Sequence, residues 1–523
     1  MSAREARRDS DAAREHPDSP VVADESALDA SVEDSRDAFD ARESDAPGPP
    51  PDAPGSSARK PRQGDDFTLT IEAFDARGHG LARSDPYRFK VQRAAVGSTV
   101  RARVLRRRRD EVEAVAFEVL DAGVHAAQPQ CAHFQSCGGC AFQDLAYAEQ
   151  LAGKKRLVES ALRARGLLAP GVVVHDVVAA PTSWRYRNKM EFTYSNRRWI
   201  ALDEPAGVDA SFALGMHALG LYSKVVDVRA CPIQAEIADA IVTAARAIAL
   251  ERGVSPWDLK LHTGLLRHIV IRRAERTNEV LVNLVTSADA PEIVEPYAQE
   301  LAARVPGITT IVQTVNSRAA TTAIGERERT LLGAGTITEE LCGLRFAISA
   351  GSFFQTNTLA AERMFEAVRE EAALGPDGVA WDLYCGTGTI SLVLARGARA
   401  VVGFELVASA IRDARANAER NGIANVRFVE GDVLTGLSAT ADLPAPDVLV
   451  LDPPRAGLHP RVVPSLAAVP ARRLVYVSCN PAAAAVDVAA LASIGWRLVR
   501  VRPFDQFPQT PHVESVLTLE RSP

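Results

Sequence analysis

A cysteine stands where a predicted strand ends and a polar turn begins. In Arg473-Leu-Val-Tyr-Val-Ser-Cys479-Asn-Pro481, an apolar and largely β-branched run predicts a buried strand, which the turn chemistry of Ser-Cys-Asn-Pro then stops. Cys479 therefore follows the carboxyl end of a strand, and in an open parallel sheet ligands bind at that edge. A thiolate placed there can act as a nucleophile. The alternative is a small buried apolar residue, the commoner role of cysteine.

Four acidic residues end other predicted strands, at Asp382, Glu405, Asp432 and Asp452. Regular alternation of strands and helices predicts a doubly wound sheet, in which these tips and Cys479 share one edge. The first strand enters a glycine-rich turn over residues 384–389, and Glu405 follows about 20 residues later, where an acid can accept from ribose hydroxyls. Each acid alone could be a solvated or capping residue. Five tips in register indicate a binding site.

Three cysteines within ten residues, Cys131, Cys137 and Cys140, form a chelating loop that requires a fourth ligand. Cys231, which precedes a proline, is the candidate for that ligand. A zinc site usually contains a second closely spaced Cys or His pair, whereas an iron–sulfur cluster more often takes an isolated distant Cys followed by Pro. Because no second pair is present, the spacing favours a cubane iron–sulfur cluster over zinc and over three unrelated buried cysteines.

The length of 523 residues predicts two to four domains at roughly 100 to 200 residues each. The odd number of cysteines, 7, argues against a disulfide framework. No apolar run of about 18 residues and no apolar N-terminal signal occur, so we expect a cytoplasmic protein with no membrane partner. We also expect a monomer. Residues 1–62 hold 15 acidic and 9 basic side chains with a proline-rich end, which predicts a disordered acidic tail.

Short β-type runs separated by glycine turns predict a small antiparallel barrel over residues 63–122. It carries a basic block at Arg106–Arg109, either a phosphate-contacting patch for RNA or a solvated charge run. Residues 123–346 are predicted to form a β-rich central domain that begins with a helix over 144–166, capped by Asp144. Residues 347–523 are predicted to form the Rossmann-like domain. The predicted fold class is thus a multidomain α/β protein.

Several motifs in this order are similar to those of the RNA 5-methyluridine methyltransferases, an S-adenosylmethionine-dependent class I family acting on 23S rRNA and on the tRNA T-loop. The resemblance covers about residues 67–523. It rests on the cysteine loop ending at Gln143 and on Phe353-Phe-Gln355-x-Asn357, Asp382-x-Tyr-Cys-Gly-x-Gly388, Asp452-Pro-Pro-Arg-x-Gly457, Ser478-Cys-Asn-Pro481 and Phe507-Pro-Gln-Thr-Pro-His512-Val-Glu514.

The resemblance implies a TRAM-type barrel, a central domain holding a [4Fe-4S] cluster, and a methyltransferase domain with Cys479 as nucleophile and Glu514 as base. It implies that the cluster is bound by Cys131, Cys137, Cys140 and Cys231. Contacts to S-adenosylmethionine are expected from Gln355, Tyr384, Thr389, Glu405, Asp432 and Asp452. Two positions depart from the family pattern: Thr389 stands where many members have Asn, and Asp144 where a His often follows.

The chemistry agrees with this resemblance. Uracil C5 is a weak nucleophile, but addition of a thiolate at C6 produces an enolate whose C5 can attack a methyl group. The C5 proton must then leave, which requires a carboxylate near the ring. We expect methylation of a single-stranded or loop uridine, most readily in 23S rRNA, with the tRNA T-loop as the alternative.

Two other functions were weighed. Asp452-Pro-Pro is also typical of exocyclic-amino methyltransferases, but those place an aromatic residue where this chain has Arg455, and they need neither Cys479 nor Glu514. A non-catalytic RNA-binding factor would show erosion of Cys479, Glu514 or the turn after Asp382. None of these is eroded, so an RNA uracil-C5 methyltransferase is the favoured reading.

Overall fold

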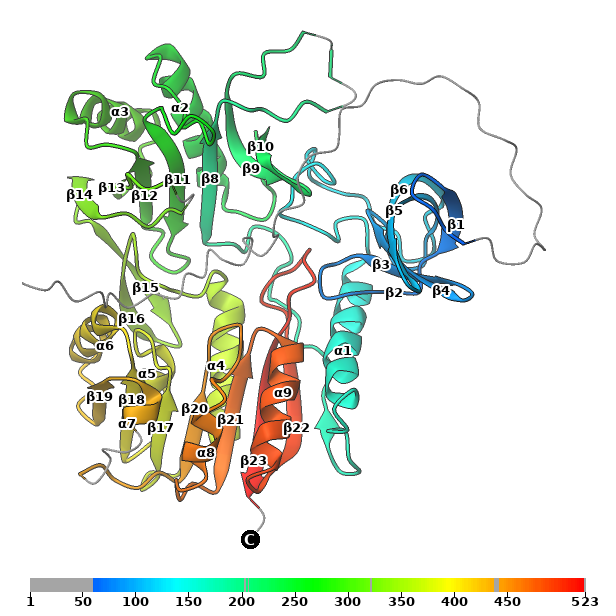
Figure 1. Ribbon diagram of the computed structural model, residues 1–523. Helices are drawn as coiled ribbons and strands as arrows, with labels where there is room; N and C mark the ends of the chain where they lie inside the picture. The colour runs from blue at the N-terminus through cyan, green and yellow to red at the C-terminus, as the bar shows by residue number, and fades with distance from the viewer. Residues whose placement is uncertain (1–59, 202–203, 206, 320–321, 437–441, 522–523) are drawn as a thin grey trace, which may run out of the picture. The chain divides into compact units, whose positions relative to one another are not determined.

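The computed structural model describes residues 60–201, 204–205, 207–319, 322–436 and 442–521 (Figure 1). Apart from its last three residues, the predicted acidic tail at 1–62 lies outside these ranges. Among the described helices, none combines the length and apolar character that crossing a bilayer requires.

The first sheet has the strand order β1-β5-β6-β4-β3-β2. Its core is formed by alternating apolar residues such as Val100, Ala102 and Val104 in β5. Just after β1, the Glu72 N–H donates to the Leu81 carbonyl in β3, which draws the two ends of the sheet together. The strands span Asp66–Thr70 (β1), Ala73–Phe74 (β2), Gly80–Ser84 (β3), Tyr87–Gln92 (β4), Thr99–Arg108 (β5) and Glu111–Asp121 (β6).

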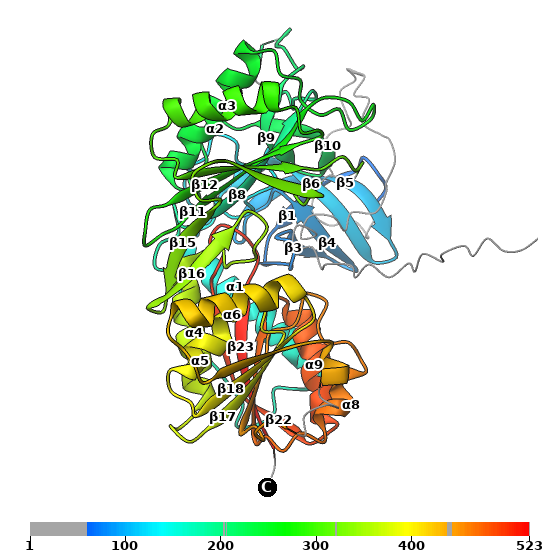
Figure 2. The same cartoon turned by 90° about the vertical axis from the view of Figure 1, so that its left-hand side faces the viewer.

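A second sheet has the order β10-β9-β8-β11-β12-β13-β14 and is antiparallel except between β12 and β13, which α3 connects. Helices α2 and α3 cover one face of it through Ile241, Ala245 and Leu301 (Figure 2). Its elements are β8 (Lys189–Ser195), β9 (Ala213–Ala218), β10 (Leu221–Asp227), α2 (Glu236–Glu251), β11 (Leu266–Arg273), β12 (Val280–Thr286), α3 (Pro291–Arg304), β13 (Thr310–Val315) and β14 (Arg327–Leu332).

The third sheet has the order β19-β18-β17-β20-β21-β23-β22-β7. Strands β17 to β21 are parallel, and β23 runs antiparallel between β21 and β22. The strands span β7 (Val173–Val174), β17 (Val379–Leu383), β18 (Ala400–Glu405), β19 (Val426–Glu430), β20 (Val448–Leu451), β21 (Arg473–Ser478), β22 (Trp496–Phe504) and β23 (Glu514–Arg521). The predicted α/β fold class, with its doubly wound sheet and β-rich N-terminal region, is confirmed.

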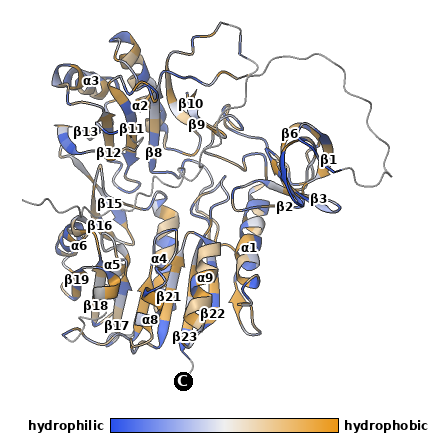
Figure 3. Ribbon diagram, in the orientation of Figure 1, coloured by the Kyte–Doolittle hydropathy of each residue, from blue (hydrophilic) through white to orange (hydrophobic). Residues whose placement is uncertain are grey.

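Helices cover both faces of the third sheet, whose strands are largely apolar (Figure 3). On one face α4, α5 and α6 pack together with the hairpin β15–β16, and on the other face α1, α8 and α9 pack. Their bounds are α1 (Tyr147–Arg163), β15 (Thr336–Leu341), β16 (Leu344–Ser349), α4 (Thr358–Ala372), α5 (Thr389–Ala395), α6 (Ala408–Arg420), α7 (Val433–Gly436), α8 (Val462–Leu466) and α9 (Pro481–Ala492).

Helix α1 is shorter than predicted, and Asp144 does not cap it. The N-cap is Ala146, which makes no side-chain cap bond. A turn in which the Leu145 N–H donates to the Phe142 carbonyl holds Asp144 before the helix, and burial raises the pKa of its carboxyl to about 6. Helix α1 packs in the core of the third sheet, and β7 pairs with β22. Two elements that precede the second sheet in the chain therefore complete the third.

Candidate active site

Five strand tips share one edge of the third sheet. In the order β19-β18-β17-β20-β21, the residues within two positions of the strand ends are Asp432, Glu405, Asp382, Asp452 and Cys479. Every neighbouring pair in this series is parallel, so the carboxyl ends lie on the same side. The structure therefore brings together the acids and the cysteine that the spacing had assigned to one edge.

A glycine-rich turn connects β17 to α5. Tyr384, Gly386 and Gly388 have positive φ angles of 69°, 53° and 83°. At Gly388 a Cβ would also lie only 2.8 Å from the Phe428 ring, so this position needs glycine. Thr389 follows as the first residue of α5. The turn thus leaves the backbone open beside the strand tips.

Glu405 fixes this turn to the next strand. Its Oε2 accepts from the Gly386 N–H at 3.1 Å, and its Oε1 accepts from the Val407 N–H at 2.8 Å. Burial, followed by nearby carboxylates that include Asp432 and Glu405, raises the pKa of the Tyr384 hydroxyl to about 12. Tyr384 is therefore the point around which the acidic tips gather.

Asp382 lies beneath the turn and is fully buried. The Ser391 hydroxyl donates to its Oδ2 at 2.6 Å, while Oδ1 has no hydrogen-bond partner among the described residues. Burial, opposed by Ser391 and increased by the charge of Glu405, raises the pKa of Asp382 to about 7. The site therefore contains a buried acceptor oxygen that a bound ligand could satisfy.

Gln355 lies in the segment between β16 and α4, where two parts of the chain meet. Its backbone carbonyl accepts from Asn188 Nδ2 at 2.9 Å, just before the second sheet. Two residues later, Asn357 caps α4 by accepting from the Ala360 N–H, and its Nδ2 donates to the Gln506 carbonyl at 3.0 Å. The segment is thus held on both sides, and the Gln355 side chain is half-buried.

The loop that follows Asp452 is held against the neighbouring strand. The Asp452 N–H donates to the Leu383 carbonyl at 3.3 Å. Asp487 Oδ2 accepts from the Leu458 N–H at 2.8 Å and from the Tyr476 hydroxyl. Between them Gly457 has a φ of 89°, and a Cβ there would lie 2.5 Å from Asp487 Oδ2. Only glycine allows the loop to pass at this distance.

Cys479 lies between the end of β21 and the start of α9, and it is half-buried. Asn480 caps this helix by accepting from the N–H groups of Ala482 and Ala483, and its Nδ2 donates to the Arg455 carbonyl at 3.1 Å. The N-terminus of a helix carries partial positive charge, which favours an anion such as a thiolate nearby. The cap also ties the cysteine to the loop of Asp452.

Glu514 is the first residue of β23 and is buried. In the antiparallel ladder between β21 and β23, Ser478 pairs with Ser515. Cys479 follows Ser478 and Glu514 precedes Ser515, so both residues lie at the same end of this ladder. On its other side Glu514 pairs with Phe504 in β22. The residues predicted as nucleophile and base therefore lie at the same end of two paired strands.

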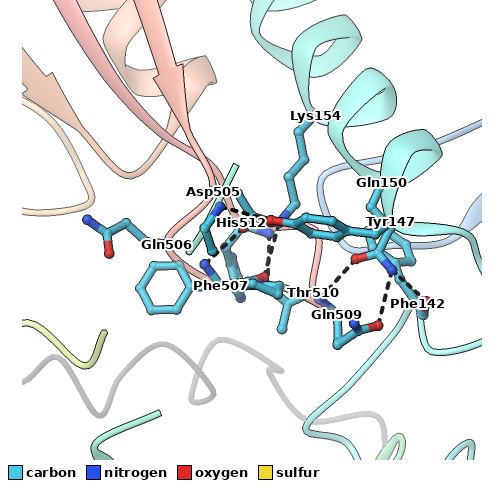
Figure 4. Close-up of polar contacts among 12 residues, drawn as sticks. Phe142, Tyr147, Gln150, Lys154, Asp505, Gln506, Phe507, Gln509, Thr510 and His512 are labelled. Atoms are coloured by element: carbon cyan, nitrogen blue, oxygen red, sulfur yellow. Dashed lines mark hydrogen bonds and ion pairs between the residues drawn. The ribbon is translucent and has the colours of Figure 1, made fainter. Parts of the chain in front are cut away.

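A loop over residues 505–513, here called the hairpin loop, connects β22 to β23 (Figure 4). It carries His512, whose pKa is lowered to about 4 by burial and then by the charges of Arg455, Lys154 and Arg187. His512 stacks edge-on against Phe507. A neutral imidazole next to Arg455 therefore lies two residues before Glu514.

The predicted cysteine ligands lie near one another. The His133 N–H donates to Cys131 Sγ and the Gly139 N–H to Cys137 Sγ, each at 3.4 Å. The pKa of Cys231 is raised to about 12, mainly by burial and further by the charges of the neighbouring cysteines. Burial likewise raises the pKa of Cys140 to about 11. Within the described ranges, no three His, Cys, Asp or Glu side chains are arranged to hold a metal ion.

Two family models match the C-terminal part of the chain. A general methyltransferase-domain model matches residues 376–454, which include Asp382, Tyr384 and Glu405. The tRNA (uracil-5-)-methyltransferase model matches residues 441–522, which include Asp452, Cys479 and Glu514. The matched segments together cover the edge described above.

Full-length relatives extend the match over most of the chain. An uncharacterized RNA methyltransferase of Chlorobaculum tepidum is 38% identical over 437 residues, covering 82% of this chain and 90% of the relative. Another, of Caldanaerobacter subterraneus subsp. tengcongensis, is 35% identical over 465 residues, covering 88% of this chain and 100% of the relative. The chain belongs to the RNA (uracil-5-)-methyltransferase family. The resemblance seen in its motifs is thereby confirmed.

A solved structure shares the fold of this chain. The tRNA (uracil-54, C5)-methyltransferase of Pyrococcus abyssi, in complex with S-adenosyl-L-homocysteine, superposes with a TM-score of 0.67 at 27% identity. The match covers 87% of this chain and 100% of that one. The arrangement of the domains is therefore that of a known RNA-modifying enzyme.

The residues that hold the hairpin loop were not predicted from the sequence. Lys154 and Gln150 in α1 contact Asp505 and Gln509 of that loop. A signal for Lys154 was present, because it falls among the apolar residues of α1 that face the core, four residues before Val158. A lysine at such a position is buried only when it is paired.

Proposed function

We propose that this RNA methyltransferase forms 5-methyluridine, with S-adenosylmethionine as methyl donor, Cys479 as nucleophile and Glu514 as general base. The observation that carries the proposal is the pairing of Ser478 with Ser515, which supports a thiol and a carboxylate at the same end of two paired strands, at the ligand edge of the sheet. An exocyclic-amino methyltransferase needs neither group in that arrangement.

The chemistry requires two bonds to form and two to break on the uracil ring. The Cys479 thiolate adds to C6, and the resulting enolate makes C5 nucleophilic. S-adenosylmethionine, when bound, supplies the electrophilic methyl group. Glu514 then removes the proton from C5, and the electron pair of that C–H bond restores the C5–C6 double bond as the thiolate leaves C6. The carboxylate and the thiol must therefore reach adjacent ring atoms, which their places at one end of the β21–β23 ladder support.

The edge has the groups that an adenosyl sulfonium ligand needs. Glu405 ends β18, where an acid can accept from ribose hydroxyls, and Asp382 Oδ1 is a buried acceptor without a partner in the described structure. The residues proposed to hold the methyl donor are Gln355, Tyr384, Thr389, Glu405, Asp432 and Asp452. Support also comes from the Pyrococcus abyssi relative, whose structure contains S-adenosyl-L-homocysteine.

Two RNA substrates are candidates. We propose 23S rRNA as the substrate, because the motifs of this chain are similar to those of a family that includes the 23S rRNA uridine enzymes. The tRNA T-loop is the second candidate, favoured by the match to a tRNA (uracil-54, C5)-methyltransferase. In either RNA the target must be unpaired or flipped out, because a thiol cannot reach C6 inside a stacked helix. Mapping methylated uridines in RNA from a deletion strain distinguishes the two.

We further propose that Cys131, Cys137, Cys140 and Cys231 bind a [4Fe-4S] cluster. A single zinc ion needs all of its sulfur ligands about 2.3 Å from one point, whereas a cubane places each thiolate on a different iron. The four thiols are close enough to raise one another's pKa, and backbone N–H groups are directed at two of the sulfurs. Both observations favour a cubane, whose thiolate ligands are spaced more widely than those of a single zinc ion. The cluster contributes no step to the methylation proposed above.

Two variants separate the roles of the proposed nucleophile and base. Cys479→Ala is expected to bind RNA and methyl donor yet form neither an adduct nor a product, because the enolate cannot arise. Glu514→Gln is expected to add and methylate but to release the product slowly, so that methylated RNA stays attached to Cys479. The measurement is denaturing electrophoresis with radiolabelled RNA, in which only Glu514→Gln should give a retarded band.

Cys342→Ala is the matched control, since this cysteine lies in the turn of the β15–β16 hairpin and its thiol is directed at the Glu362 carbonyl. It should turn over like the unmodified enzyme. A protein-linked band with Cys479→Ala, or normal turnover in that variant, would remove the nucleophile assignment and restore the amino-methyltransferase alternative.

A further inference from the structure

A buried ion pair lies at the base of the hairpin loop. Lys154 Nζ donates to Asp505 Oδ1 at 2.6 Å and to the Phe507 carbonyl at 3.0 Å, and both charged side chains are 0% exposed. The Phe507 N–H donates to the same Oδ1 at 3.0 Å. Burying two charges costs several kcal/mol, and such pairs often add no net stability. The pair therefore calls for an explanation other than stability.

A second anchor lies one helical turn away. Gln150 Nε2 donates to Gln509 Oε1 at 3.1 Å, and Gln150 Oε1 accepts from the Gln509 N–H at 3.0 Å. Gln509 has a φ of 71°, which a residue with a side chain adopts only when its surroundings enforce it. Because Gln150 and Lys154 are four residues apart, they lie on one face of α1 and bind the hairpin loop at two points (Figure 4).

Glu514 follows the hairpin loop directly. Phe504, the last residue of β22, pairs with Glu514, the first residue of β23, and the loop between them is held by the anchors of α1 and by further bonds from Asn357 and Tyr186. Glu514 is thus the first sheet residue after the anchored loop. A displacement of about 1 Å at a reacting group can cost about 100-fold in rate.

Cys479 is positioned by other groups. Ser478 Oγ accepts from the Asn480 N–H at 3.0 Å, and Asn480 caps α9. These bonds involve neither α1 nor the hairpin loop. A change at the anchors should therefore affect the proposed base and leave the proposed nucleophile in place.

We propose that Lys154, Asp505 and Gln150 are positioning residues that hold the hairpin loop so that Glu514 reaches the C5 proton. The inference rests on the proposed function, since it assigns these residues to the step in which that carboxylate acts. It predicts a selective defect: release of the RNA adduct slows, while formation of the adduct continues.

Lys154→Met tests this inference, because it keeps the apolar stem and leaves Asp505 without its counterion. Adduct release measured after rapid mixing should slow about 10- to 100-fold, whereas adduct formation should change less than about threefold. Lys155→Met is the matched control: it is the next residue of the same helix, and its ammonium group makes an exposed pair with Asp176. That variant should release the adduct at the unmodified rate.

Two further variants address loss of folding. Lys154→Met/Asp505→Asn removes both charges and retains an oxygen that can accept from the Phe507 N–H, so its melting temperature should recover relative to Lys154→Met alone. Gln150→Met disrupts the second anchor without burying a charge and should also slow release selectively. Equal slowing of formation and release in both Lys154→Met and Gln150→Met would show a merely structural role and overturn the inference.

Failure of this inference can be told apart from failure of the proposed function. If Glu514→Gln accumulates the adduct and Lys154→Met behaves like Lys155→Met, only the positioning role is wrong. If Glu514→Gln accumulates no adduct, the assignment of the base is wrong, and the positioning role is overturned with it.

Discussion

Asp382 is a carboxyl group in a place where its charge is disfavoured. It is fully buried, and burial raises its pKa from 3.8 to about 7. Because the folded protein then holds the proton more tightly than the unfolded chain, this group's contribution to stability is complete below about pH 4. That contribution is lost as the pH rises through about 7.

Asp382→Asn should therefore flatten the dependence of stability on pH. Between pH 5 and pH 7 the free energy of unfolding should fall by about 2 kcal/mol more in the unmodified protein than in the variant. Urea unfolding without ligands at several pH values measures this difference. The same substitution at Asp432, which is exposed, should retain the unmodified slope. An equal pH dependence of stability in Asp382→Asn would contradict the raised pKa.

The ribbon of β5 and β6 carries the basic block that was predicted to contact phosphates. One arginine of this block already forms an ion pair with an acidic side chain. Among the described residues, no side-chain ion pair involves Arg108 or Arg109, both of which are exposed. Within the block, Arg106 is paired with Glu113 on the neighbouring strand. Two further arginines of β5 are also paired, Arg101 with Glu118 and Arg103 with Asp66. Arg108 and Arg109, at the end of the ribbon, are therefore the candidate phosphate contacts.

Replacing Arg108 and Arg109 by Gln should weaken RNA binding and flatten its salt dependence. Each lost phosphate contact should remove about 0.7 to 0.9 from the slope of log affinity against log salt. Arg106→Gln is the matched control, because the Glu113 carboxylate already accepts from both ends of that guanidinium. Filter binding at a series of salt concentrations gives the slopes. An unchanged slope in the double variant would make the block a solvated charge run.

Much of the third sheet could be predicted because its strands are continuous apolar runs that end in polar turns. The tips at Asp382, Glu405 and Cys479 follow from that pattern alone. The placement of Glu514 could be predicted only as far as the edge of the sheet. Its place at the same end of the ladder as Cys479 depends on the last strand inserting between β21 and β22, a long-range choice that no local pattern encodes.

The position of α1 could not be predicted at all. Its apolar residues require a core but do not say which one, and it packs against the third sheet although the second follows it in the chain. For the same reason the ion pair of Lys154 could not be predicted, because its partner Asp505 lies hundreds of residues away in the sequence. Side-chain pairing across such distances is decided by tertiary packing.

At the scale of the whole molecule, the cysteine loop is joined to the hairpin loop. The N–H groups of Ala141 and Phe142, directly after Cys140, donate to the Gln509 carbonyl at 2.9 and 3.1 Å. A cluster bound by the four cysteines would therefore stiffen a segment in contact with the catalytic half of the protein.

Protein purified without oxygen should be brown and contain about four iron atoms and four sulfide ions per chain. Cys231→Ser should lose the iron and the sulfide, whereas Cys342→Ser, in the turn between β15 and β16, should retain them. Metal analysis and the visible absorption spectrum provide the measurement. Stoichiometric zinc without iron in such a preparation would refute the cluster.

The pairing of β7 with β22 determines the order in which this protein can be assembled during translation. Strand β7 leaves the ribosome long before its partner β22 has been made. The second sheet can fold in the interval, and the Asn188 N–H then donates to the Thr356 carbonyl, so the two ends of the intervening chain meet. Folding of that sheet shortens the loop that β7 and β22 must close, and so lowers its entropic cost. The nascent chain thus holds an unpaired strand and an uncovered helix until β22 has been made.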